Sequence, residues 1–170
     1  MTTAAAIEGR KAGAPAWSKS SRVAAVDIFS DIDAAASIWR SLENQHHLLT
    51  PYQRFDFLRP WQTLVGANEE LSPLIAVAYD RDHVPLLLLP LVIKQSRGIR
   101  IAQFMGGKHA TFNMALWNRD FAAVASRADL NVVFAELRER ARVDVLAFEQ
   151  QPLSWQDQIG RASCRERVWR

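Results

Sequence analysis

The sequence predicts an α+β domain in which one mixed, mostly antiparallel β-sheet is flanked by helices. Three segments rich in apolar and β-branched residues follow one another between short turns, at 74–79, 84–94 and 99–105. Such a run is typical of an antiparallel meander. Segments with apolar residues at helical spacing lie before and after it, at 32–42 and 120–142. Helices that cover the faces of a sheet bury both apolar surfaces at once.

Length and composition favour one globular domain. The chain has 170 residues, of which 49% are hydrophobic and 23% charged, and this is enough for a single hydrophobic core. The longest apolar run, residues 85–93, is too short to cross a bilayer, and the first twenty residues lack the apolar segment of a secretory signal. We therefore expect a cytoplasmic protein without a membrane span, in which residues 1–21 form a flexible arm and residues 22–155 the folded domain.

The net charge of +3 comes from the last ten residues, and the rest of the chain is neutral. The same stretch holds the only cysteine, Cys164, and has neither a helical nor a strand period. Its sequence, GRASCRERVWR, resembles read-through from an adaptor at the end of a truncated gene. We expect residues 156–170 to be a truncated end with a non-native tail and expect no nucleic-acid partner. An arginine-rich arm for nucleic acid or membrane lipid is the alternative.

The first elements are predicted to be a strand over residues 22–29 and a helix of about fourteen residues after it. Ser30 or Asp31 can cap this helix. Its apolar residues recur at helical spacing, at Ile32, Ala35, Ile38, Trp39 and Leu42.

The segment TPYQRFDFLRPW predicts further helix. Thr50 can be the N-cap, Pro51 suits the first helical position, and Gln53 can complete a capping box. Pro60 would remove one helical hydrogen bond at a cost of about 3 kcal/mol, so we expect a kinked helix or two short ones. Apolar residues recur at steps of three and four, at Phe55, Leu58, Trp61, Leu64 and Val65. We interpret this stripe first as part of the core and, as an alternative, as the lining of a groove.

The second half is predicted to contain the meander, one long helix and a last strand. Continuous leucines at residues 86–89 indicate a central strand that is covered on both faces. A helix is expected over residues 120–142 and a strand over 143–149, so that the order is β-α-α-β-β-β-α-β. The inner side of the long helix is expected to be Ala123, Val124, Leu130, Val133, Phe134, Leu137 and Ala141.

Four blocks in this layout resemble a known family. They are W-R-S-L, T-P-Y-Q-x-x-x-F-L-x-x-W, A-V-A-Y-D-x-D-x-V-P-L-L-L-L-P-L and F-M-G-G-K-H-A-T-F-N. Over about residues 22–155 the chain resembles the N-terminal half of the CelD-like acetyltransferases, named for cellulose biosynthesis, of the GNAT superfamily. The resemblance implies a GNAT-like fold, here the N-terminal unit of a tandem, with a missing C-terminal GNAT-like half as its partner.

The activity that this resemblance implies is acyl transfer. An acetyl or other acyl group would move from acetyl-CoA or another acyl-CoA to an amine or hydroxyl of a sugar or small metabolite. The family's cofactor loop, R/Q-x-x-G-x-G/A, presents backbone N–H groups of a helix N-terminus to a pyrophosphate. Residues 103–108 and 95–100 both lack the last small residue of this loop. We therefore expect no cofactor-binding residues in this chain, acetyl-CoA as a cosubstrate only of the longer parent, and an inactive fragment.

The candidate substrate site is the loop GGKHATFN, residues 106–113. Two glycines free the backbone at the end of a strand, and loops at strand ends often carry function. The loop offers one cation, one titratable base and two hydrogen-bonding groups, at Lys108, His109, Thr111 and Asn113. An ordinary exposed connection is the alternative. The catalytic residues stay unknown, and the histidines lack partners at metal-ligand spacing, so no metal site is expected.

A non-enzymatic α+β module that binds a partner protein is the alternative function. The aromatic residues between 55 and 61 would form its binding surface. Such a module needs no CoA site and should expose a contiguous apolar patch.

Overall fold

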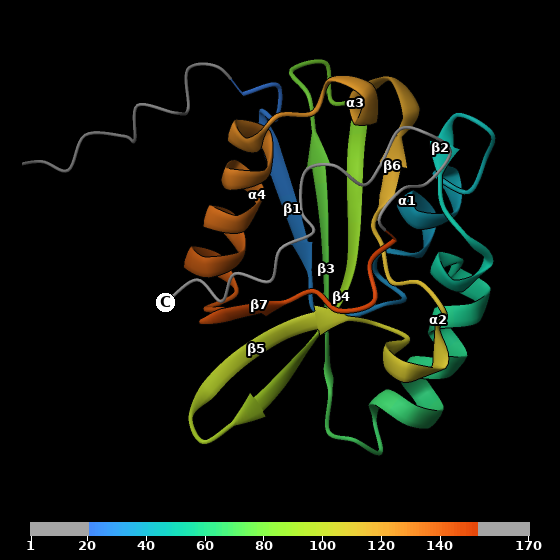
Figure 1. The fold of residues 1–170 in the computed structure, drawn as a ribbon, viewed down its shortest axis with the longest axis vertical. Coiled ribbons are helices and arrows are strands. Elements are labelled where there is room, and N and C mark those ends of the chain that lie inside the picture. The colour runs from blue at the N-terminus through green and yellow to red at the C-terminus, as the bar shows by residue number, and fades with distance from the viewer. Residues whose placement is uncertain (1–20, 153–170) are drawn as a thin grey trace, which may run out of the picture.

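The computed structural model describes residues 21–152. Within them lies one open, mostly antiparallel sheet of seven strands with helices on both faces (Figure 1). The predicted α+β class is confirmed. The strands are β1 (Ala25–Phe29), β2 (His47–Leu48), β3 (Ser72–Tyr79), β4 (Pro85–Ser96), β5 (Ile99–Phe104), β6 (Leu116–Asn118) and β7 (Val145–Ala147). The α-helices are α1 (Ala36–Ser41), α2 (Phe55–Trp61), α3 (Arg119–Val124) and α4 (Arg127–Arg140).

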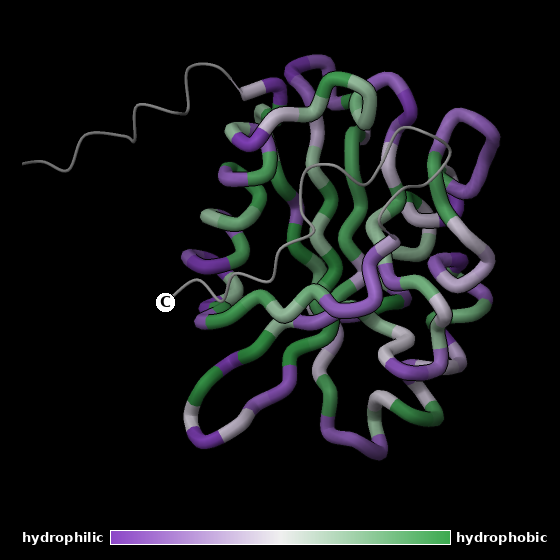
Figure 2. Tube along the Cα trace, in the orientation of Figure 1, coloured by the Kyte–Doolittle hydropathy of each residue, from purple (hydrophilic) through white to green (hydrophobic). Residues whose placement is uncertain are grey.

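The predicted meander forms the centre of the sheet. The strand order is β1-β3-β4-β5-β7, and β6 pairs with both β4 and β2. Residues 86–93 of β4 are all buried, and Figure 2 shows apolar residues along β3 and β4 with polar ones in the connecting loops. Alternate side chains enter the two cores: Leu87 and Leu89 pack on the side of α4, and Leu88 packs on the side of α1 and α2. The expected central strand, covered on both faces, is confirmed.

Strands β5 and β7 are the parallel pair among the described strands, with Gln103 opposite Ala147. The chain between them passes through β6, α3 and α4. Because the two strands run in the same direction, the segments that follow them begin at the same edge of the sheet. The strand over 143–149 was predicted, but its partner was not.

The first helix is shorter than predicted. Residues 30–35 form turns, with hydrogen bonds from Ala35 N to Ile32 O and from Ala36 N to Asp33 O, and α1 covers only Ala36–Ser41. The side chains of the predicted inner face are nevertheless buried, except for the half-buried Ile38. Three-residue turns bring these side chains to the same side of the chain, so the apolar pattern is satisfied without a regular helix.

The capping box at Thr50 is present, but it caps a 3-10 helix of three residues, Pro51–Gln53. Arg54 is then extended (φ −69°, ψ 143°), and α2 begins after it. The side chain of Glu43 accepts a hydrogen bond from the backbone N–H of Phe55, at 2.5 Å. The carboxylate of Glu43, which follows α1, thus satisfies the first N–H group of α2. This stabilises the break at Arg54 between the 3-10 helix and α2.

The helical segment is also interrupted near Pro60, as expected, because its regular α-helical part ends one residue later, at Trp61. Pro60 lies inside α2, and the chain continues as a π-helical turn, Gln62–Gly66. The wider turn is closed by a hydrogen bond from Ala67 N to Gln62 O, at 2.8 Å. A π turn changes the spacing of the side chains, and Leu64, expected on the inner stripe, is exposed.

The long helix predicted over 120–142 is two helices. Ala125 leaves the helical conformation (ψ 134°) between α3 and α4, and Ser126 forms a capping box with Asp129. The serine hydroxyl competes with the helix for backbone N–H groups, which favours a new start. As a result Ala123 and Val124, expected on the inner side, are exposed.

Asp129 is a fully buried carboxylate that joins the start of α4 to the chain before β1. It accepts hydrogen bonds from Ser126 N and Oγ, at 2.8 and 2.6 Å. It also accepts from Arg22 N, at 2.5 Å, and from Ser21 Oγ, at 3.1 Å. Burial by itself would raise the pKa of Asp129, but the hydrogen bonds from Ser126, Arg22 and Ser21 outweigh it and hold the pKa below the usual 3.8.

This carboxylate should contribute to the pH dependence of stability. A group with a lowered pKa in the folded state stabilises the fold above its unfolded pKa and loses that effect as the pH falls through the folded value. We expect the difference in unfolding free energy between wild type and Asp129→Asn to be constant near neutral pH and to shrink below pH 3.8. Urea unfolding over a pH series measures it, with the exposed Asp120→Asn as control. A difference that persists unchanged in acid would contradict this role.

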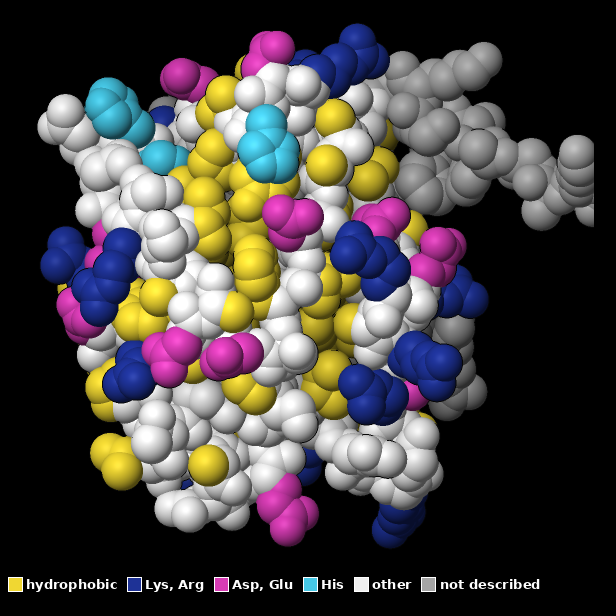
Figure 3. Space-filling model, turned by 180° about the vertical axis from the view of Figure 1, so that it is seen from behind, with side chains coloured by type: hydrophobic (Ala, Val, Ile, Leu, Met, Phe, Trp, Pro, Cys, Tyr) yellow, Lys and Arg dark blue, Asp and Glu magenta, His cyan; other side chains and the backbone are white. Residues whose placement is uncertain are grey.

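Charged side chains of both signs are mixed on the described surface. Figure 3 shows one face, on which acidic and basic side chains are interspersed. The large exposed apolar residues lie on separate segments, at Leu64, Val84, Ile99, Phe112 and Val124. No helix within residues 21–152 has the length and apolar character that crossing a membrane requires.

Candidate functional site

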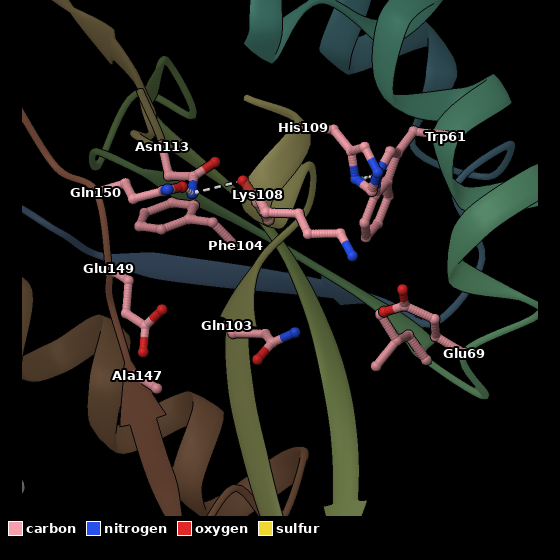
Figure 4. Close-up of a pocket in the computed structure, with 12 residues that line it drawn as sticks. Trp61, Glu69, Gln103, Phe104, Lys108, His109, Asn113, Ala147, Glu149 and Gln150 are labelled. Carbon is pink, nitrogen blue, oxygen red and sulfur yellow. Dashed lines mark hydrogen bonds between the residues drawn. The ribbon is translucent and has the colours of Figure 1, made fainter. Parts of the chain in front are cut away.

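A cavity of about 220 Å³ lies where β5 and β7 end (Figure 4). Ligands of open sheets with parallel strands often bind at the carboxyl ends of those strands. The other side is closed by Trp61 at the end of α2 and by Glu69 and Leu71, which follow the π-helical turn. The cavity is lined by Trp61, Glu69, Leu71, Gln103, Phe104, Gly107, Lys108, His109, Asn113, Ala147, Glu149 and Gln150.

The loop after β5 is shaped by its two glycines. Gly106 has φ +92° and Gly107 has φ +45°, values that L-residues with side chains rarely adopt. They turn the chain from β5 into a single 3-10 turn, Gly107–His109. The far end of the loop is held by Gln53, whose Nε2 donates to Phe112 O at 2.8 Å. The loop is therefore tied to the same segment that precedes α2.

The structure brings together three of the four predicted site residues. Lys108, His109 and Asn113 line the cavity. Thr111 is not among the lining residues, and its hydroxyl donates to the Tyr52 hydroxyl at 3.0 Å. Lys108, His109 and Thr111 are all exposed, so the contact of the Thr111 side chain with Tyr52, away from the cavity, is what separates Thr111 from the other two.

Asn113 is buried and joins the two strand ends. Its Nδ2 donates to Gly107 O at 3.4 Å and to Gln150 Oε1 at 3.1 Å. Its backbone N–H donates to Gln150 O at 3.0 Å. Asn113 thus connects the loop after β5 with the segment after β7, which makes it a positioning residue for the cavity wall.

Charged side chains surround the cavity from three segments. Glu69 and Glu149 lie on opposite walls, and Lys108 extends between them (Figure 4). Glu69 follows the π-helical turn and Glu149 follows β7. Two carboxylates against one ammonium group favour a ligand that carries positive charge or several hydrogen-bond donors.

Sequence reasoning missed several lining residues because they come from segments that are distant in the chain. No sequence pattern assigns a site role to Glu69, Glu149 or Gln150, and Gln103 enters only as the first residue of a possible cofactor loop. One signal was available. Gln103 and Glu149 stand near the ends of two predicted strands, and polar residues at strand ends are candidates once the strands are known to be parallel neighbours.

Trp61 belongs both to the core and to the site. It is only 8% exposed and packs with the core on the side of α1 and α2. Its indole Nε1 lies 3.2 Å from His109 Nδ1. Phe55 and Leu58 are buried in the same core, so the core interpretation of the stripe is confirmed for them, and Trp61 also lines a cavity. None of these three side chains is exposed as a docking surface for a partner.

The two glycine stretches do not fit a CoA pyrophosphate. Residues 95–100 contain the hairpin turn between β4 and β5, where Gly98 has φ +81°. The turn Gly107–His109 ends at Ala110, which is extended (φ −106°, ψ 132°). Neither stretch opens an α-helix, whose first N–H groups would hold the anion. Within the described part of the chain no group of three or more histidine, cysteine or acidic residues is placed to bind a metal ion.

No protein-family model, curated protein or solved structure matches this chain. The resemblance to the CelD-like acetyltransferases, with the cofactor and acceptor that it implies, stays a prediction. The roles of the lining residues rest on the geometry of the cavity and on their chemistry.

Proposed function

We propose that this domain is the acceptor-binding part of a GNAT-type acyltransferase. The cavity at the ends of β5 and β7 would hold an amine or hydroxyl of a sugar or small metabolite. The observation that carries the proposal is the placement of Glu69 and Glu149 on opposite walls of one small cavity. The resemblance of the sequence blocks to CelD-like proteins supports acyl transfer as the reaction class.

The size and chemistry of the cavity favour a small amine. Its volume of about 220 Å³ is below the range of roughly 300–1,000 Å³ that is usual for drug-sized ligands. Carboxylates accept strong hydrogen bonds from an ammonium group. An amine must lose a proton before it can attack a carbonyl group, and a carboxylate in contact with it can take that proton. Glu69 and Glu149 are the residues we propose for these contacts.

The acyl donor that the resemblance implies is acetyl-CoA. The glycine stretches of this domain do not fit its pyrophosphate. We therefore place the donor site in the C-terminal GNAT-like half that the resemblance implies.

A binding experiment tests the acceptor site. Glucosamine is the probe and glucose is its matched control, since the two sugars differ in one amine. In ¹H–¹⁵N spectra of the full chain, glucosamine should shift the signals at the ends of β5 and β7. Glu149→Gln should weaken its binding about fivefold, or about 1 kcal/mol, because the amide oxygen still accepts a hydrogen bond but lacks the charge that strengthens it. Acetyl-CoA in the same titration should leave those signals unchanged.

Glu139→Gln serves as the control variant, because Glu139 is exposed on α4 and does not line the cavity. It should bind glucosamine as the wild type does. Equal affinity of wild type and Glu149→Gln would overturn the proposed contact. Shifts that avoid the strand ends would overturn the site.

A further inference from the structure

His109 lines the cavity with one ring nitrogen already engaged. The indole Nε1 of Trp61 lies 3.2 Å from His109 Nδ1 (Figure 4). An indole nitrogen can only donate a hydrogen bond, so Nδ1 must accept it and carries no proton. A neutral imidazole then has its hydrogen on Nε2, and that nitrogen is a donor.

Both partners of this hydrogen bond are held by their surroundings. Trp61 is almost fully buried in the core on the side of α1 and α2, so the indole N–H cannot turn to another partner without disturbing the core. His109 ends the turn Gly107–His109, whose direction is determined by the positive φ angles of Gly106 and Gly107. The packed core therefore selects the tautomer of an exposed histidine.

We propose that Trp61 makes His109 a hydrogen-bond donor to the ligand, so that the Lys108–His109 end of the cavity binds an anionic oxygen such as a carboxylate. The neighbouring side chain, Lys108, adds a positive charge and further donors. With Glu69 and Glu149 on the other walls, the ligand class is a small molecule that carries both an amine and a carboxylate or similar oxygen. This ligand class rests on the proposed acceptor site, whereas the tautomer of His109 does not.

The assignment changes the role expected from the sequence. His109 was the candidate for a titratable base, yet the nitrogen left for a ligand is an N–H donor. A donor at this place stabilises negative charge on an oxygen. Proton acceptance then belongs to the carboxylates, Glu69 and Glu149. Trp61 is a positioning residue, because it acts through His109.

The tautomer is tested by ¹⁵N NMR of histidine in the full chain, without ligand, at about pH 8, where an ordinary histidine is neutral. We expect a scalar coupling across the hydrogen bond between Trp61 Nε1 and His109 Nδ1, with the proton of His109 on Nε2. Trp61→Phe keeps an aromatic ring in the core but has no N–H. It should move the two nitrogen shifts of His109 toward each other as tautomers mix, and leave His83 unchanged.

His83 is a matched control, since its ring stacks on Tyr79 and is remote from the cavity. A proton on Nδ1 of His109, or an absent coupling, would overturn the proposal. Because the coupling is measured on the wild type, the result does not depend on how well Trp61→Phe folds.

The donor role is tested with acetate as the carboxylate probe. In His109→Asn an amide oxygen lies near the position of Nδ1 and can accept from Trp61, but nothing replaces Nε2. In His109→Gln an amide nitrogen reaches the position of Nε2. We expect acetate affinity to fall about tenfold in His109→Asn and less in His109→Gln. Equal affinity of wild type and His109→Asn would overturn the oxygen site. Failure of glucosamine to bind would overturn the acceptor site instead, and would leave the coupling and the acetate result intact.

Discussion

Asp129→Ala is expected to lower the free energy of unfolding by about 2–4 kcal/mol, the usual range for leaving buried donors without their charged acceptor. The lost acceptor serves Ser126 N and Oγ, Arg22 N and Ser21 Oγ. These donors belong to the start of α4 and to the chain before β1, so the substitution loosens the attachment of α4 to the sheet. Urea unfolding near neutral pH, followed by circular dichroism, measures the loss.

The matched control is Asp120→Ala. Asp120 also lies in the first turn of a helix, α3, but it is exposed. Its replacement should change the free energy of unfolding by less than about 0.5 kcal/mol. A loss below about 1 kcal/mol for Asp129→Ala would show that water or neighbouring groups replace the carboxylate, and would contradict its role as the anchor of α4.

Gly106→Ala is expected to damage both stability and ligand binding. Gly106 has φ +92° and ψ −38°, a conformation that is strained for alanine by about 1–3 kcal/mol. An added Cβ would lie 3.1 Å from Ala110 Cβ and 3.5 Å from Asn113 Oδ1. Relief of these contacts must move the turn that carries Lys108 and His109. We expect a loss of about 2–3 kcal/mol in stability and of more than about tenfold in glucosamine affinity.

Gly98→Ala separates the two effects. Gly98 also has a positive φ, +81°, but an added Cβ there meets no atom within 4 Å. This variant should lose about 1 kcal/mol of stability and should bind glucosamine as the wild type does. If Gly106→Ala also binds normally, the loop does not position the ligand, and the proposed site is wrong.

Local patterns predicted the elements whose cause is local. Apolar and β-branched runs between short turns identified β3, β4 and β5, and the leucine run identified β4 as central. The capping residues around Thr50 were recognised because a capping box depends on adjacent residues only. The start of α4 at Ser126 has a similar signal, a serine three residues before an acidic residue, and it was overlooked within a longer helical period.

Features that depend on distant segments were not predicted. The break at Arg54 is stabilised by Glu43, which belongs to the previous helix region. Strand β2 has two residues and exists through its pairing with β6, so it is too short to show a period. Three of the four proposed site residues meet at one cavity, but Thr111 bonds to Tyr52 instead, because a sequence window does not show which way a loop side chain points.

By itself, the sequence determined the α+β class, the central antiparallel strands and the loop at residues 106–113 as the place to look for a ligand. The hydrophobic pattern depends on residues that are close together in the chain, and the conformational freedom of a glycine depends on that residue alone. Both can therefore be recognised in the sequence. Only the tertiary structure decided that Glu69, Lys108 and Glu149 surround one cavity and that Trp61 bonds to His109. The physical reason is the parallel pairing of β5 with β7 and the packing of α2 beside them. Both join segments that are far apart in the sequence and have no local signal of their meeting.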